Sequence, residues 1–231
     1  MSDNSKNIMI GVAVAAGVLT IGYFMTKFVG KLIRGGYKKY TISDFTTKKS
    51  GGSIITVPKS DLKKYDVVIV YGGIAFATPD FMLKELKDSS AKNLLYSNIF
   101  IFVPYTNKWA ATSVWINEIE GKYKVNNMSI IGYSAGGIDV QDAYSHDYKF
   151  VGLIDPSTES RFLKKPFGKN VYMVYNDANW SGQYAAIGRT LVKLEKVIND
   201  KGGNAKKIEK KHRDLPKYFF EKYENEINGF D

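Results

Sequence analysis

The chain has 231 residues, of which 44% are hydrophobic and 24% charged, a balance that is typical of a globular protein and excludes a disordered chain. It contains no cysteine and 2 histidines, which excludes disulfides, a thiol nucleophile and thiolate metal sites and argues against a multi-histidine metal site. The formal net charge of +10 favours anionic partners. Because no zinc-finger or RNA-recognition pattern accompanies this charge, we predict attraction to lipid headgroups, no nucleic-acid partner, no metal and no cofactor.

An uncharged and almost entirely apolar run occupies residues 8–25 (IMIGVAVAAGVLTIGYFM). As a helix that rises ~1.5 Å per residue, it would just span a ~30 Å hydrocarbon core. A cleaved signal peptide is the alternative, because the Ala-Val-Ala at 13–15 imitates a cleavage site. The run continues past that site, however, and Lys6 alone is a weak basic start. The segment therefore predicts a single transmembrane helix that anchors the chain in a lipid bilayer.

The charges that flank the apolar run predict its orientation. Five basic residues follow it within about 15 residues, whereas Lys6 alone precedes it. The positive-inside rule then places the rest of the chain on the cytoplasmic side. Small residues in the run would let two such helices approach closely and form a homo-oligomer. They are Gly11, Ala15, Gly17 and Gly22.

Three regions follow from the pattern: an anchor with its basic flank at 1–34, a polar linker with turns at 35–52, and one domain at 53–231. Within the domain, short apolar runs alternate with segments of helical periodicity. Strands without a polar face, separated by helices, indicate a mostly parallel sheet covered on both faces, which is a three-layer α/β sandwich. In chain order the predicted strands are 53–57, 66–71, 98–103, 128–131, 150–154, 171–175 and 205–209, and the predicted helices are 79–95, 109–123, 135–148, 183–199 and 215–227.

The sequence Gly-Tyr-Ser-Ala-Gly at 132–136 lies between a predicted strand and a predicted helix. G-x-S-x-G in that context is a nucleophile elbow, a sharp turn that exposes the serine hydroxyl above the sheet. The glycines keep the turn free of clashes with the strand and the helix. The backbone N–H of Ala135 would lie at the helix N-terminus, where it can stabilise a developing oxyanion. We therefore predict that Ser134 is a nucleophile.

A serine hydroxyl needs a base, and the base needs a carboxylate that orients it. His212 follows the last predicted strand, so it lies at the same carboxyl edge of the sheet as Ser134, whereas His146 lies on the helix that leaves the turn. We predict His212 as the base. Asp177, just beyond the strand at 171–175, is favoured as the acid, and Asp155 is the alternative.

With these residues the chain resembles the α/β-hydrolase fold over roughly residues 40–231, since Ser134, Asp177 and His212 follow that family's order of nucleophile, acid and base. The resemblance implies an oxyanion loop at residues 71–75 (YGGIA), similar to the H-G-G loop of lipases and esterases with a tyrosine in place of the histidine. Gly73 or Ile74 would then supply the second backbone donor beside Ala135.

The resemblance implies acyl transfer from an ester or acylated substrate to water. We expect a membrane-anchored serine hydrolase that is esterase-like or lipase-like. Two alternatives stay open: an inactive α/β-hydrolase-fold module that binds or supports a membrane or a membrane-containing particle, and a peptidase of the same fold. Candidates for lining an acyl pocket are Phe76, Trp109, Tyr133 and Trp180.

Overall fold

The structure, a computed structural model, describes residues 39–42, 45–50, 52–59, 64–105, 116–117, 119–145 and 147–229. The predicted anchor at 8–25, most of the predicted helix at 109–123, and His146 lie outside these ranges. Across the ranges that are described, no helix has both the length and the apolar character needed to cross a membrane.

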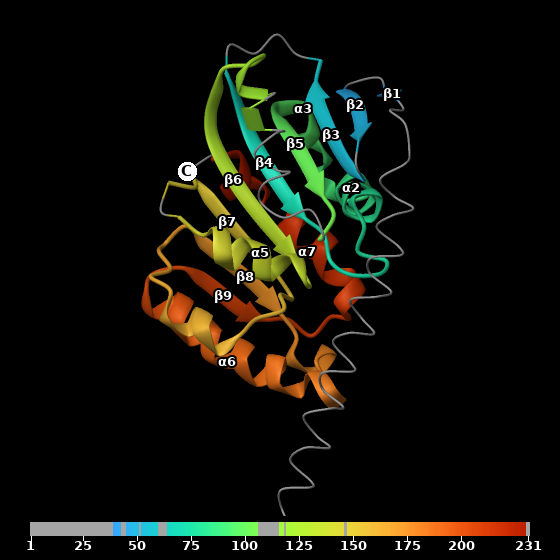
Figure 1. The fold of residues 1–231 in the computed structure, drawn as a ribbon. Coiled ribbons are helices and arrows are strands. Elements are labelled where there is room, and N and C mark those ends of the chain that lie inside the picture. Colours follow the sequence, from blue (N-terminus) through green and yellow to red (C-terminus); the bar gives the residue numbers. More distant parts are fainter. Residues whose placement is uncertain are drawn as a thin grey trace, which may run out of the picture.

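A nine-stranded sheet forms the middle of the molecule, with the order β1-β2-β3-β5-β4-β6-β7-β8-β9 (Figure 1). Strands β1 to β3 are antiparallel, and the strands from β4 to β9 run parallel, as the sequence predicted. The bounds are β1 Lys39–Ile42, β2 Phe45–Ser50, β3 Ser53–Pro58, β4 Tyr65–Tyr71, β5 Asn98–Val103, β6 Val125–Tyr133, β7 Phe150–Ile154, β8 Val171–Tyr175 and β9 Asn204–Lys207.

Helices cover both faces of this sheet, which confirms the three-layer sandwich. Helices α2 (Pro79–Lys87), α3 (Leu94–Ser97), α7 (Leu215–Lys222) and α8 (Glu224–Asn228) pack on one face. Helices α5 (Gly136–Ala143) and α6 (Ala185–Asp200) pack on the other.

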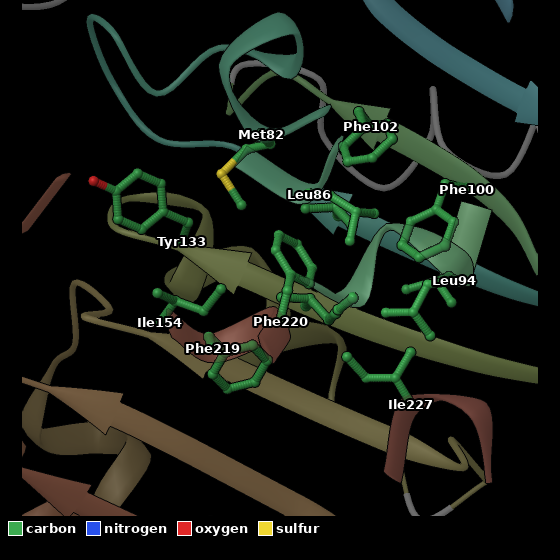
Figure 2. Packing of buried hydrophobic residues seen from close by; sticks show 14 of the residues in the cluster. Met82, Leu86, Leu94, Phe100, Phe102, Tyr133, Ile154, Phe219, Phe220 and Ile227 are labelled. Atoms are coloured by element: carbon green, nitrogen blue, oxygen red, sulfur yellow. The ribbon is translucent and has the colours of Figure 1, made fainter. Parts of the chain in front are cut away.

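Central strands show why a run without polar residues is needed. In β4, Val68 and Val70 join the first cluster of buried side chains, whereas Val67 and Ile69 join the second. Successive side chains of a strand point to opposite faces, so a strand between two helical layers has two apolar faces. Figure 2 shows the first cluster, in which rings and aliphatic chains from α2, β5 and α7 interlock. Burial of each such side chain contributes about 1.5–3 kcal/mol.

Several elements differ from the predicted ones. The stretch predicted as linker and turns at 35–52 includes β1 and β2, which pair through their backbones with the apolar β3. The predicted helix at 79–95 ends at Lys87 and is followed by a 3₁₀ turn and α3, and the predicted final helix divides at Tyr223. Strands β5, β7 and β8 have the predicted bounds.

The parallel arrangement fixes the place of the site. The carboxyl ends of β4, β6, β7, β8 and β9 all lie at one edge of the sheet, because parallel strands share one direction. The loops that follow these strands carry the residues predicted to act in catalysis.

Candidate active site

Ser134 lies in a sharp turn between β6 and α5, as predicted. Its φ is +53°, in the left-handed region that costs a residue with a side chain about 1–2 kcal/mol. Three backbone hydrogen bonds hold this conformation: Ser134 N–H donates to the carbonyl of Ile154 at 3.0 Å, and the Ser134 carbonyl accepts from Gly137 at 3.0 Å and from Ser157 at 2.7 Å. Strain that is held by surrounding contacts is typical of functional positions.

The glycines of the turn make room for close backbone contacts. A Cβ on Gly136 would lie 2.3 Å from the carbonyl oxygen of Gly72 and 2.6 Å from that of Tyr71. A Cβ on Gly132 would lie 2.6 Å from the carbonyl oxygen of Gly136. The end of β4 and the start of α5 can therefore approach each other only because these positions lack side chains.

Asp155 and His212 form a direct pair at this edge of the sheet. The Nδ1 of His212 lies 2.6 Å from Oδ2 of Asp155. Asp155 is fully buried, whereas the His212 side chain keeps 26% of its exposure. A carboxylate on Nδ1 fixes the tautomer in which Nε2 is free to accept a proton. The pair therefore has the arrangement of an oriented general base.

The loop after β8 completes the surroundings of Asp155. Oδ1 accepts from the backbone N–H of Asn176 at 3.0 Å and from Nε1 of Trp180 at 3.1 Å, and Oδ2 also accepts from Nδ2 of Asn179 at 2.7 Å. A buried carboxylate stays charged at low cost only when it is hydrogen-bonded in this way. The sequence analysis named Trp180 as a pocket candidate but did not identify any of the three as donors to Asp155, although the polar side chain of Asn179 in this loop was an available signal.

The prediction that Asp177 orients the histidine is wrong in this structure. Asp177 begins the 3₁₀ turn after β8, and its Oδ1 lies 2.7 Å from Nζ of Lys207 at the end of β9. That ammonium group holds the pKa of Asp177 below its usual value. Because β8 and β9 are neighbours, Lys207 reaches the Asp177 carboxylate and pairs with it. Asp155, the alternative, lies beside His212 instead.

The loop after β4 lies against the serine, as the resemblance implied. A Cβ on Gly73 would lie 2.7 Å from Cβ of Ser134 and 3.2 Å from its Oγ. The N–H of Gly73, however, donates to the carbonyl of Ala77 at 2.9 Å, so Gly73 provides space rather than a donor. In the turns, loops and helix caps that the structure describes, the N–H groups of Ile74 and Ala135 donate to no backbone carbonyl.

Tyr133 links the turn to the loop that carries the histidine. Its ring stacks on the His212 ring at 4.8 Å with an interplanar angle of 30°, and its hydroxyl donates to the His212 carbonyl at 3.1 Å. Burial raises the pKa of Tyr133, so this hydroxyl stays protonated. Figure 2 shows the hydroxyl pointing away from the packed rings of the core. Tyr133 therefore positions the histidine and is not a free wall of an acyl pocket.

Two other predicted pocket residues border the histidine. The ring of Trp180 lies 5.6 Å from the His212 ring, and that of Phe76 lies 6.3 Å from it, both edge to face. Phe76 is 47% exposed, as is Ile74 in the same loop. Trp109 lies outside the described residues. The site therefore offers an apolar rim beside the imidazole.

Comparison with known proteins gives structural matches. No protein-family model and no curated protein matches the sequence. An esterase from Pyrobaculum calidifontis aligns with a TM-score of 0.51 and 13% identity over 92% of this chain and 93% of its own. An S-formylglutathione hydrolase from Agrobacterium tumefaciens aligns with a TM-score of 0.54 and 11% identity over 85% of this chain and 98% of its own.

A third similar structure is an uncharacterised protein from Capnocytophaga ochracea, with a TM-score of 0.54 and 10% identity over 82% of this chain. The chain spans 63% of the length of that protein. Identities this low are evidence for the fold alone. The strand order, the turn at Ser134 and these likenesses show that the chain has the α/β-hydrolase fold.

Proposed function

We propose that the protein is a serine hydrolase that cleaves esters, with Ser134 as nucleophile, His212 as general base and Asp155 as the acid that orients it. The observation that carries the proposal is the 2.6 Å pair between His212 and the buried Asp155, at the edge of the sheet where the strained Ser134 turn lies. This order along the chain is still nucleophile, acid and base, as in the α/β-hydrolases.

In the proposed mechanism, Nε2 of His212 takes the proton of Ser134 as its oxygen attacks the substrate carbonyl. Asp155 stabilises the imidazolium that forms. The N–H groups of Ile74 and Ala135 donate to the oxyanion, and loss of one such donor typically costs about 2.7–4 kcal/mol of transition-state stabilisation. The imidazolium then protonates the leaving alcohol, and water, deprotonated by His212, releases the acid.

Esters are favoured over amides because two of the similar structures described above are, by name, an esterase and an S-formylglutathione hydrolase. The fold alone does not choose between them. A panel of ester and anilide substrates that share one acyl group separates an esterase from a peptidase.

The test is labelling by a fluorophosphonate probe, together with turnover of a short-chain nitrophenyl ester. We expect wild type to label and turn over, and Ser134→Ala to lose both. Ser157→Ala is the matched control, because Ser157 lies next to the turn and contacts it through its backbone N–H. A folded wild type that neither labels nor turns over would indicate the inactive module, and labelling that persists in Ser134→Ala would contradict the assignment.

We also propose that residues 8–25 anchor the enzyme in a bilayer with the catalytic domain on the cytoplasmic side, and that the small residues of the segment permit self-association. The apolar run and the basic residues after it support this proposal. The full chain should stay in the membrane fraction after alkaline carbonate extraction, and a chain that lacks residues 1–34 should be released. Release of the full chain by carbonate would contradict the anchor.

A further inference from the structure

The loop that carries His212 places a cation directly beside the candidate site. Arg213 follows His212 and is exposed. Its guanidinium lies 6.0 Å from the ring centre of Phe76 and 5.9 Å from that of Phe81. The two rings contact each other edge to face at 5.4 Å. A guanidinium held near two aromatic rings has less side-chain freedom to lose when it binds a ligand.

The same rings border the catalytic groups. Phe76 lies edge to face with the His212 ring at 6.3 Å, and Phe81 stacks with Tyr133, the residue before the serine, at 6.1 Å. The Phe76 ring therefore lies near both the Arg213 guanidinium and the imidazole. The charge also acts on the site, since Arg213 lowers the pKa of Tyr133 against the larger effect of burial.

Arg213 keeps its charge available for a ligand. Among the described residues, no carboxylate forms an ion pair with it, whereas Lys207, six residues earlier, pairs with Asp177. Besides Arg213, three acidic groups act on the pKa of Tyr133: Asp155, Glu85 and Asp214. Asp155 is already satisfied by its donors. Burial raises the pKa of Glu85, and the nearby Arg213 offsets part of this rise without forming an ion pair with Glu85.

We propose that Arg213 selects substrates that carry an anionic group, so that the site takes amphiphilic esters with a negative charge a few bonds from the scissile carbonyl. The exposed Ile74 and Phe76 would contact the apolar part of such a substrate, and Arg213 would pair with its carboxylate. This inference rests on the proposed function and names the substrate class of the same site.

The test compares two nitrophenyl esters of one acyl length: 4-nitrophenyl hydrogen adipate, whose free carboxylate is charged, and its neutral methyl ester. We expect wild type to have a kcat/KM about fivefold or more higher for the charged ester, as a partly exposed ion pair allows. Arg213→Gln should bring the ratio of the two values close to one, and Arg213→Lys should restore part of the preference. Raising the ionic strength should reduce the wild-type ratio.

Lys217→Gln is the matched control, because it removes an exposed cation in α7, four residues further along the chain, and should leave the ratio unchanged. A wild-type ratio of one or less, or a preference that Arg213→Gln retains, would overturn the inference while the hydrolase assignment stands. If neither ester is turned over by wild type, the proposed function fails, and the substrate class fails with it.

Discussion

Replacing Asp155 with asparagine is expected to lower kcat/KM for a nitrophenyl ester by about 10³- to 10⁴-fold. The side-chain amide would remove the negative charge that stabilises the imidazolium of His212, and its NH₂ group would favour the wrong tautomer. Steady-state kinetics on the purified variant measures the loss. Because Asp155 also accepts bonds from Asn176, Asn179 and Trp180, a thermal unfolding curve must show that the variant is folded at the assay temperature.

Asp177→Asn is the matched control for this prediction. It makes the same chemical change one strand away, where the carboxylate pairs with Lys207 and not with the histidine. Because Lys207 lowers the pKa of Asp177, the pair stabilises the fold at neutral pH, and that contribution disappears as the pH falls through the titration of the carboxyl. Exposed pairs of this kind contribute little to the free energy of unfolding, so the variant should stay folded. Its kcat/KM should then stay within about threefold of wild type. A loss in Asp177→Asn that equals or exceeds that in Asp155→Asn would contradict the pairing.

The parallel sheet was readable from the sequence because its central strands have apolar side chains on both faces. The runs NIFIFV, FVGLI and VYMVY have no polar face, and they form β5, β7 and β8 with the predicted bounds. Strands β1 and β2 could not be found in this way. The runs KYTI and FTTKKS carry lysines and threonines, as strands near a sheet edge often do, and their pairing depends on the backbone of β3.

The positions of Ser134 and His212 at one edge of the sheet were also readable, because a turn motif and the direction of the strands place them. Which carboxylate lies beside His212 was not. Asp155 and Asp177 both follow parallel strands, and strand direction alone puts both at the correct edge. What separates them is the side-chain environment: a lysine on β9 pairs with Asp177, and the loop after β8 turns three donors toward Asp155.

The loop at residues 71–75 is a second case in which the sequence predicted the position of a segment but not its hydrogen bonds. The glycines at 72 and 73 correctly indicated a close approach to the serine, since a Cβ on Gly73 would lie 2.7 Å from Cβ of Ser134. Which amide is free depends on the turn that follows. That turn directs the N–H of Gly73 to the Ala77 carbonyl and leaves Ile74 as the donor that the proposed mechanism uses.

Gly136→Ala is expected to cost about 3 kcal/mol of unfolding free energy, or on the order of 10 °C in Tm. Its Cβ would lie 2.3 Å from the carbonyl oxygen of Gly72 and 2.6 Å from that of Tyr71, and both oxygens belong to the backbone, so neither can turn aside as a flexible side chain would. Relief requires the start of α5 to move away from the end of β4. That movement would separate Ala135 from Ile74, so kcat/KM should fall even in the fraction of variant that remains folded. Urea unfolding followed by circular dichroism, with kinetics below the transition, measures both effects.

Gly182→Ala separates this steric cost from the general effect of changing a glycine. Gly182 has a φ of +59°, and a Cβ there would meet nothing within 4 Å, so the only cost is a left-handed backbone with a side chain, about 1 kcal/mol. Its kcat/KM should stay close to that of wild type, because the residue precedes α6 and contacts none of the proposed catalytic groups in the described structure. If Gly136→Ala unfolds at the same urea concentration as Gly182→Ala, the backbone of the serine turn does not lie against β4. The oxyanion site formed between them would then be lost from the mechanism.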